Sequence, residues 1–325
     1  MIRPFHLRDL ALVRRLSEGG VPLHTESALT SNLNPWRSAL YSLVGGDFPT
    51  YVCKLKEQNA AGFIQLVVED GQQHAHILFL SSTAREETNV LPNSHIDEDV
   101  WLLLLDQAVT EIGRRGIHSL VAEVSETGDE LPVLRRAGFA VYTRQDIWVI
   151  NPITDKTSPH LLRPRQSADD WEIQLLYANT VPRLVQLVEP VPPIEFGDGW
   201  VLRENDELTA FVHFHCGSTA TWMRLFVHPN AEAMTDEILA EALQISPQKN
   251  DKPVYCCVRR YQSWIQNSLQ RYGFRHWGSQ AVMVKHVVKP VQKPVGELSR
   301  VIEQTGIPAS APIVHHWQQT DSMSY

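Results

Sequence analysis

The chain has 325 residues, of which 43% are hydrophobic and 20% are charged, so its composition excludes a disordered or collagen-like chain and is typical of a folded globular protein. Its 29 basic and 37 acidic residues give a formal net charge of −8, which disfavours bulk electrostatic binding to nucleic acid or to an anionic membrane. At roughly 150 residues per domain, we expect two domains.

The sequence carries no segment that predicts export or membrane insertion. No apolar run approaches the ~20 residues needed to cross a bilayer, and the opening MIRPFHLRDL lacks the apolar core of a signal peptide. The four cysteines (Cys53, Cys216, Cys256 and Cys257) are not spaced in pairs, which is typical of unbridged thiols in a reducing compartment. We therefore expect a cytoplasmic protein.

Strands are predicted along the first 150 residues by alternating side-chain character. Residues 50–56 and 62–69 alternate around a polar turn at Gln58-Asn59, which indicates a hairpin. Residues 73–81 predict a third strand, and residues 120–124 (LVAEV) a fourth.

The clearest helix is predicted for residues 97–115. Its apolar residues follow the i, i+3, i+4, i+7 pattern of one buried face and are Trp101, Leu104, Leu105, Ala108, Val109 and Ile112. Gly116 ends this helix. A further helix ends at Gly138, the usual residue for a left-handed helix stop, and Phe139 can fold back on its last turn. A two-stranded segment is predicted to follow, up to Ile150.

The second part of the chain repeats this order. Its opening LRPRQSADDWEIQLLY (162–177) matches IRPFHLRDLALVRRL (2–16), because each reads as a strand ending in Arg-Pro before the acidic start of a helix. Asp9 opens the first of these helices, and Asp169 or Asp170 opens the second, where a carboxylate can cap free N–H groups.

The middle and the end of the second part also have counterparts. A hairpin over 199–204 and 208–216 turns at Asn205-Asp206, and 220–228 predicts the next strand. A helix at 235–245 and a strand at 254–258 follow. The closing LQRYGFRHWGSQAVMVK carries Gly273-Phe274, which corresponds to Gly138-Phe139, again with a two-stranded segment after it.

We therefore predict a tandem repeat. Residues 1–150 form the first unit, and residues 161–288 form the second. The polar stretch 151–160, flanked by prolines, is predicted to be a linker. The Pro-containing tail 289–325 is predicted to be extended and to dock either across the body of the protein or on a protein partner.

Each half resembles the GCN5-related N-acetyltransferase superfamily. The resemblance covers residues 1–288 and rests on the opening Arg3-Pro4 and Arg163-Pro164, the strand LFVHP (225–229), and the helix-Gly-Phe-strand units at Gly138 and Gly273. It implies an α/β fold with two tandem acetyltransferase-like domains. Each domain would be a mixed, mostly antiparallel sheet with helices on both faces.

The resemblance implies acyl transfer from acetyl-CoA or another acyl-CoA to a small-molecule or protein amine, without a metal. The acyl carrier would lie against splayed strands, where backbone groups pair with its pantetheine arm. The implied cofactor-binding residues are Phe79, Leu80, Leu225, Phe226 and Val227. The family also holds the pyrophosphate with a Gly- and Arg-rich loop at a helix N-terminus, where free N–H groups attract anions.

Two features depart from that family pattern. In each half, the loop between the third predicted strand and the next helix contains no glycine. Both of these helices also have an acidic start, at Asp97–Asp99 and at Asp236-Glu237. Carboxylates there stabilise the helix but oppose a pyrophosphate at the same place. Leu134 and Leu269 stand where the family often has a tyrosine that protonates the departing thiolate.

Three residues are candidates for catalysis. Glu123 lies on the predicted central strand, where a carboxylate is costly unless it is paired or lines a cleft, so it is either a general base or the partner of an arginine. His213 and His215 share one face of a strand, with His228 nearby in the sequence, and fit a general base, a metal ligand or a polar strand face. His74 and His76 repeat this spacing in the first half, with a polar strand edge as the simpler reading.

The sequence leaves two functions open. The first is an atypical acyl-CoA-dependent N-acyltransferase, and the second is a catalytically inactive protein of the same fold that binds a small molecule or a protein. An open V-shaped cleft between the paired strands of either half would favour the enzyme. A cleft plugged by Trp222, Phe226 or the tail would favour the binding module.

Overall fold

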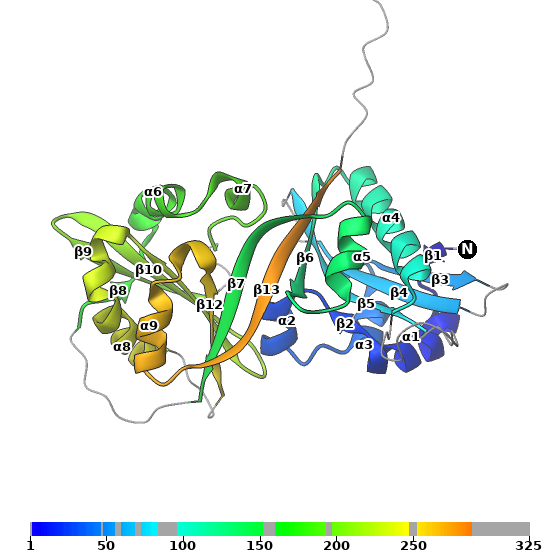
Figure 1. Cartoon of the computed structure of the whole chain (residues 1–325), viewed down its shortest axis with the longest axis horizontal. Helices are drawn as coiled ribbons and strands as arrows, with labels where there is room; N and C mark the ends of the chain where they lie inside the picture. The colour runs from blue at the N-terminus through cyan, green and yellow to red at the C-terminus, as the bar shows by residue number, and fades with distance from the viewer. Residues whose placement is uncertain are drawn as a thin grey trace, which may run out of the picture. The chain divides into compact units, whose positions relative to one another are not determined.

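The computed structural model describes residues 2–46, 48–55, 60–68, 73–83, 96–151, 160–192, 197–246 and 252–287, all within one compact unit (Figure 1). The predicted turn at Gln58-Asn59, most of the predicted linker and the tail 289–325 lie outside these residues. Among the helices that the structure describes, none has the length and apolar character needed to span a membrane.

The first half alternates strands and helices as predicted. Its elements are β1 (Ile2–Pro4), α1 (Leu10–Leu16), β2 (Val21–Pro22), α2 (Thr25–Thr30), α3 (Pro35–Ser42), β3 (Thr50–Leu55), β4 (Ala60–Val67), β5 (His74–Ser82), α4 (Glu98–Arg114), β6 (Ser119–Ser125), α5 (Glu130–Arg136) and β7 (Ala140–Ile150).

The second half repeats the order. Its elements are β8 (Arg163–Pro164), α6 (Asp170–Thr180), α7 (Arg183–Gln186), β9 (Asp198–Glu204), β10 (Glu207–Cys216), β11 (Thr221–Val227), α8 (Thr235–Ile245), β12 (Val254–Arg259), α9 (Ile265–Arg271) and β13 (Arg275–His286).

The two halves share one continuous sheet because they exchange their last strands. The main strand order is β1-β3-β4-β5-β6-β13-β7-β12-β11-β10-β9-β8, with β2 attached to β5. Thus β13, from the end of the second half, pairs with β6 of the first half, and β7 pairs with β12 of the second. The two long strands also pair with each other, and they run side by side through the middle of the sheet (Figure 1).

The exchange corrects one prediction. Each Gly-Phe pair is followed by a single long strand, β7 or β13, and not by two short strands. The physical reason is that each strand finds its second neighbour in the other half of the chain, so it does not fold back on itself. The predicted boundaries of the two units stay a prediction, but the unit that folds spans both halves.

Local signals in the sequence account for the helix ends and for one turn. Gly138 and Gly273 have φ of 87° and 88°, the left-handed region that glycine adopts without a steric cost. The N–H of the following Phe bonds back to Leu134 or Leu269, which confirms the predicted stop. Asn205 and Asp206 have φ of 49° and 66°, as a tight two-residue hairpin turn requires.

An ion pair is repeated at the start of each half. The Arg3 guanidinium donates to both carboxylate oxygens of Asp9 at 2.6 and 2.7 Å, and Arg163 binds Asp169 in the same way at 2.8 and 2.6 Å. Each aspartate also accepts a backbone N–H three residues before it. This bidentate pair ties the opening strand to the first helix in both halves.

Helices cover both faces of the sheet, and each half has its own core. The core under α4 includes Trp101 and Leu104, and Met283 of β13 belongs to it. The core under α8 and α9 includes Ile238, and Trp148 of β7 belongs to it. On the opposite face, α1 and α3 cover the first half, and α6 and α7 cover the second. Each core is therefore completed by a strand from the other half.

We predict that both cores unfold in one cooperative transition. Leu104→Ala in the first core and Ile238→Ala in the second remove fully buried side chains and should each cost about 2–4 kcal/mol. Because β7 and β13 pair with each other and each completes the core of the other half, either substitution should lower the same single transition in scanning calorimetry, with equal calorimetric and van't Hoff enthalpies. Two separable transitions, each moved by only one substitution, would contradict this.

Candidate functional site

A cavity of about 180 Å³ lies where the two halves meet. The first half contributes polar side chains from the chain around α2 and from β5 and β6, namely His24, Glu26, His74, His76 and Glu123. The second half contributes polar side chains from the chain after α7 and from β10, β11 and β12, namely Glu189, His213, His215, Arg224 and Arg259.

The alternation of side chains along the strands builds this wall. Arg224 is paired across strands with His213 on β10 and with Cys257 on β12, so these side chains share one face of the sheet. On the opposite face Met223 and Cys256 belong to the core under α8 and α9. A polar wall on one face and an apolar core on the other thus come from adjacent residues of the same strands.

Two carboxylates and two guanidiniums form a chain of ion pairs along the cavity. Glu26 accepts from Arg224 at 2.5 Å and contacts Nδ1 of His215 at 2.7 Å. Arg224 also donates to Glu189 at 3.1 Å, and Glu189 is bound on its other oxygen by Arg259. The pairs join α2 of the first half to β10, β11 and β12 of the second.

These contacts keep the two carboxylates charged although they are buried. Burial would raise the pKa of Glu26, but the Arg224 guanidinium and the hydrogen bond from His215 hold that pKa well below its usual value. Burial acts in the same direction on Glu189, and Arg259 and Arg224 outweigh it, so the pKa of Glu189 is also lowered.

A second polar chain closes the network on the first half. Arg259 donates to Oε1 of Gln145 on β7, and Nε2 of Gln145 donates to Gln280 on β13 at 2.9 Å. Gln280 accepts from the hydroxyl of Thr25 at 2.8 Å. The backbone N–H of Thr25 in turn donates to Glu123 at 2.7 Å. The two exchanged strands thus carry hydrogen bonds from one half to the other.

Three imidazoles of the first half lie together in the cavity. The ring of His76 lies 4.6 Å from that of His24 and 5.3 Å from that of His74, between centroids. Burial, reinforced at His76 by the nearby His24, lowers the pKa of His76 well below the ordinary value of 6.5. Burial also lowers the pKa of His74. Both rings are therefore neutral at pH 7 and can accept a hydrogen bond.

All three predicted catalytic candidates line this one cavity. The partner that the structure gives Glu123 is the N–H of Thr25, and that of His215 is Glu26. His213 lines the cavity from the neighbouring position on β10. His228 lies at the far end of β11, where its Nδ1 accepts from the N–H of Asn230.

The sequence reasoning missed the charged partners of these residues. Arg224 and Arg259 could have been found, because each is a charge within an otherwise apolar strand, on the face of that strand opposite to the core. Glu26 and Glu189 lie in parts of the sequence without a strong hydrophobic periodicity. No residue near them in the sequence indicates that they face each other across Arg224.

The predicted carrier site of the first half is filled by the chain itself. The parallel pairing of β5 with β6 stops at His76, and β2 lies beyond that point. Val21 pairs with Leu80 and Pro22 with Phe79. The next residue, Leu23, donates its N–H to β5 at 3.2 Å and accepts the N–H of Glu123 on β6 at 2.8 Å. The first half therefore does not fit a pantetheine arm.

This closure is tight. An added Cβ at Gly20 would lie 2.2 Å from the ring of Phe79, so the segment enters between the strands only with glycine at this position. Residues 21–23 make this closure, whereas Trp222 and Phe226 lie on β11 of the second half.

The second half lacks such a closure in the part of the chain that the structure describes. The parallel pairing of β11 with β12 ends at Arg224 and Cys257, and both strands continue beyond it. Leu225 and Val227 pack in the core under α8, and Phe226 packs beneath α6 against Tyr177 and Phe211. Among the described residues, no strand pairs with β11 and β12 between their two edges beyond Arg224 and Cys257.

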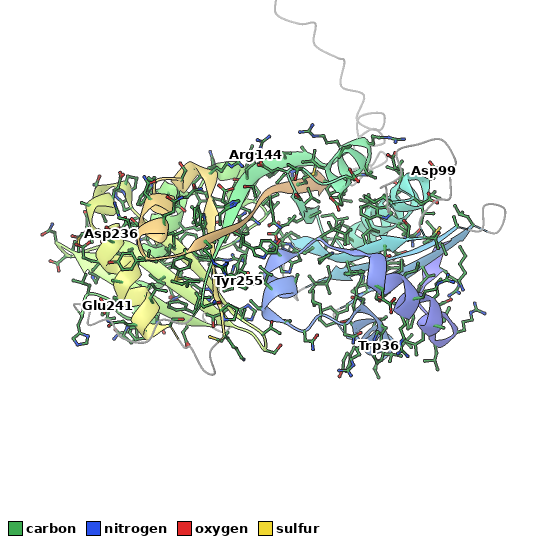
Figure 2. All side chains as sticks on the ribbon, turned by 60° about the horizontal axis from the view of Figure 1, so that its bottom comes forward. Trp36, Asp99, Arg144, Asp236, Glu241 and Tyr255 are labelled. Carbon is green, nitrogen blue, oxygen red and sulfur yellow. The ribbon has the colours of Figure 1, made fainter. Side chains whose placement is uncertain are left out.

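As far as the described residues show, the starts of α4 and α8 do not form a phosphate cradle. Asp97 caps α4 by accepting the N–H of Val100 at 3.2 Å, and Glu98 pairs with Arg136 of α5. The first turn of α8 has an ion pair like that of Glu98 with Arg136: Asp236 (labelled in Figure 2) pairs with Arg271 of α9 at 2.6 Å. These carboxylates occupy the positive ends of the helices, so a glycine-rich cradle for pyrophosphate is not reproduced.

Two leucines and two cysteines that the sequence analysis names offer no reactive group. Leu134 and Leu269 are fully buried. Cys256 lies in the core, and Cys257 faces the cavity side, where burial raises its pKa to about 12. Such a thiol is a poor nucleophile at neutral pH. Within the described ranges, no group of three or more His, Cys, Asp or Glu side chains is arranged to hold a metal ion.

Comparison with known proteins identifies the fold. No protein-family model and no curated protein sequence matches the chain. The solved structure of a GCN5-related N-acetyltransferase from Sphaerobacter thermophilus superimposes with a TM-score of 0.51 at 11% sequence identity, over 89% of this chain and 96% of that chain.

Two further solved structures are similar at lower scores. A tandem GNAT protein from the clavulanic acid biosynthesis pathway has a TM-score of 0.48 at 11% identity, over 89% of this chain and 99% of that chain. A GCN5-related N-acetyltransferase from Kribbella flavida has a TM-score of 0.44 at 15% identity, over 81% of this chain and 96% of that chain. The Sphaerobacter likeness confirms the predicted resemblance and fold class, and at this identity it shows the fold alone.

The neutral histidines predict a pH-dependent stability. Because the pKa values of His74 and His76 are lowered on folding, the unfolded chain binds more protons below about pH 6.5. The free energy of unfolding should therefore be at its full value above pH 6.5. Below pH 6.5 it should decrease, by up to about 1.4 kcal/mol per pH unit for each histidine. Denaturant titrations between pH 7.5 and 5.5 measure this slope.

The matched variants are His76→Gln and His118→Gln. His118 is exposed, so its loss should leave the slope unchanged, whereas His76→Gln should make the slope shallower. An equal slope in wild type and His76→Gln would show that His76 does not resist protonation in the folded chain.

Proposed function

We propose that the chain is an atypical acyl-CoA-dependent N-acyltransferase whose second half holds the acyl carrier. The observation that carries this proposal is the difference between the two halves. Residues 21–23 occupy the strand edges of the first half, whereas the edges of β11 and β12 beyond Arg224 have no such occupant among the described residues. The first half then serves as a structural support and as one wall of the cavity.

The central cavity fits an acceptor site for this reaction. Arg224 and Cys257, the last pair of β11 and β12, lie on the cavity side of the sheet, so an acyl group held between the diverging strands is supplied beside the cavity. When bound, acyl-CoA contributes the activated thioester. The acceptor is an amine, either free or on a protein.

His215 is the general base in this proposal, and Glu26 positions it. The contact between Glu26 and Nδ1 of His215, at 2.7 Å, favours the tautomer with its proton on Nδ1, which makes Nε2 the basic nitrogen. Arg224 holds Glu26 in place from its other oxygen. Glu123 and His213 remain further candidates in the same cavity.

The acidic helix starts favour a second candidate function. Asp97 and the pairs Glu98–Arg136 and Asp236–Arg271 stand where the family holds pyrophosphate. A catalytically inactive binding module of the same fold needs no phosphate site and could keep such carboxylates. We also propose a cytoplasmic location, because none of the four cysteines forms a disulfide, and a protein contact through residues 289–325 stays a prediction.

Calorimetric titration with acetyl-CoA, and separately with coenzyme A, tests the proposal. We expect micromolar binding of one acetyl-CoA per chain, because only the second half offers open strand edges. Two molecules per chain would show that the first half opens as well. No heat and no thermal stabilisation up to millimolar ligand would leave the binding module as the function.

Two equivalent carboxylates provide matched variants for this titration. Asp236→Asn removes a negative charge from α8 and releases Arg271, so it should tighten acetyl-CoA binding about two- to five-fold. Glu98→Gln makes the same change on α4 of the closed half and should leave the affinity unchanged. The reverse pattern would assign the carrier to the first half.

Substitution of His215 separates catalysis from binding. His215→Gln should lower kcat by about a hundredfold or more, the typical loss for a general base, and leave the Kd of acetyl-CoA unchanged. It should also remove the base limb of the pH–rate profile. His118→Gln is the control. An unchanged kcat and pH profile would exclude His215 as the base.

A further inference from the structure

The central cavity has an imbalance of charge that the ion-pair network does not remove. Among the described residues, its wall carries three carboxylates and two guanidiniums, which leave one negative charge when the imidazoles are counted as neutral. Both guanidiniums are engaged, since Arg224 binds Glu26 and Glu189, and Arg259 binds Glu189 and Gln145. An anion entering the cavity would meet this excess of negative charge.

The excess negative charge is that of the Glu123 carboxylate. Glu26 and Glu189 each face at least one guanidinium. Among the described residues, Glu123 accepts at Oε2 from a neutral group, the backbone N–H of Thr25. A half-buried carboxylate with a neutral partner is stabilised by a cation that reaches it. The neighbouring His74 and His76 are neutral and can only add hydrogen bonds.

The volume of the cavity suits a small cation. A cavity of about 180 Å³ corresponds to the share of about six waters in the liquid, at about 30 Å³ each. Val121, Val188 and Val282 line it beside the polar groups, so part of the wall suits a short alkyl chain. The site has the chemistry of a short aliphatic ammonium ion.

We propose that the cavity selects a small aliphatic amine with a single positive charge, held by Glu123. The fate of this amine as the acyl acceptor rests on the proposed function, but its binding does not. The carboxylate accepts from the ammonium group, the valines contact the alkyl chain, and the ion pairs of Arg224 and Arg259 stay intact.

Calorimetric titration of the full chain, without acyl-CoA, tests this with four matched probes. They are n-butylamine, n-butanol, n-butyrate and 1,4-diaminobutane. We expect n-butylamine to bind at least about tenfold more tightly than n-butanol, and n-butyrate not to bind. Equal affinity for n-butanol, or tighter binding of n-butyrate, would overturn the proposal. Binding of 1,4-diaminobutane more than twofold tighter than n-butylamine would overturn the claim that the site selects an amine with a single positive charge.

Variants at Glu123 assign the contact. Glu123→Gln keeps an oxygen that can accept from Thr25 and should weaken n-butylamine about tenfold, while Glu123→Asp keeps the charge and should retain most of the affinity. Glu207→Gln, an exposed carboxylate on β10, is the control. Thermal unfolding checks that each variant is folded. Unchanged affinity in a folded Glu123→Gln would overturn the assignment.

The two proposals fail in different ways. Amine binding that depends on Glu123, in a chain that does not bind acetyl-CoA, would support the cavity site and reject the transferase. Acetyl transfer to amines with no effect of Glu123 on amine binding would support the transferase and reject the cavity site.

Discussion

The structure depends on the exchange of two strands between the halves. A sheet edge exposes unpaired N–H and C=O groups, and the edge of β6 is satisfied by β13 from the far end of the chain. The edge of β12 is satisfied by β7 in the same way. Neither half has a complete sheet or core without the other. The cavity exists because this exchange brings one face of β5 and β6 beside the same face of β10, β11 and β12.

A buried chain of charges is costly, and its position is therefore informative. Taking carboxylates and guanidiniums out of water is repaid only when each is paired and hydrogen-bonded. Glu26, Arg224 and Glu189 meet this condition, and they do so across the junction between the halves. An apolar seam could have joined the halves with less penalty, so a polar cavity at this place indicates a site for a ligand.

Local elements could be predicted from the sequence, and their long-range partners could not. The helix at 235–245 and the turn at Asn205-Asp206 follow from period and turn chemistry, which are local. The pairing of Val282 with Glu123 joins residues far apart in the chain, and no local signal specifies it. The segment 21–23 was missed because two paired residues are too short to show alternation. The sequence predicts Glu123 on one strand and the pair His213 and His215 on another, and their common cavity appears only once β7 and β13 are exchanged.

The exchange also bears on symmetry. Two identical chains that swap their last strands form a two-fold dimer, in which every substitution appears twice, once in each copy. A single polypeptide with the same architecture is free of that constraint. One half can close its strands with Val21 and Pro22 while the other keeps its strands apart, and one wall of the junction can carry arginines that the opposite wall lacks. Covalent linkage of two like halves is thus what allows this molecule to hold an asymmetric site at the centre of a repeated fold.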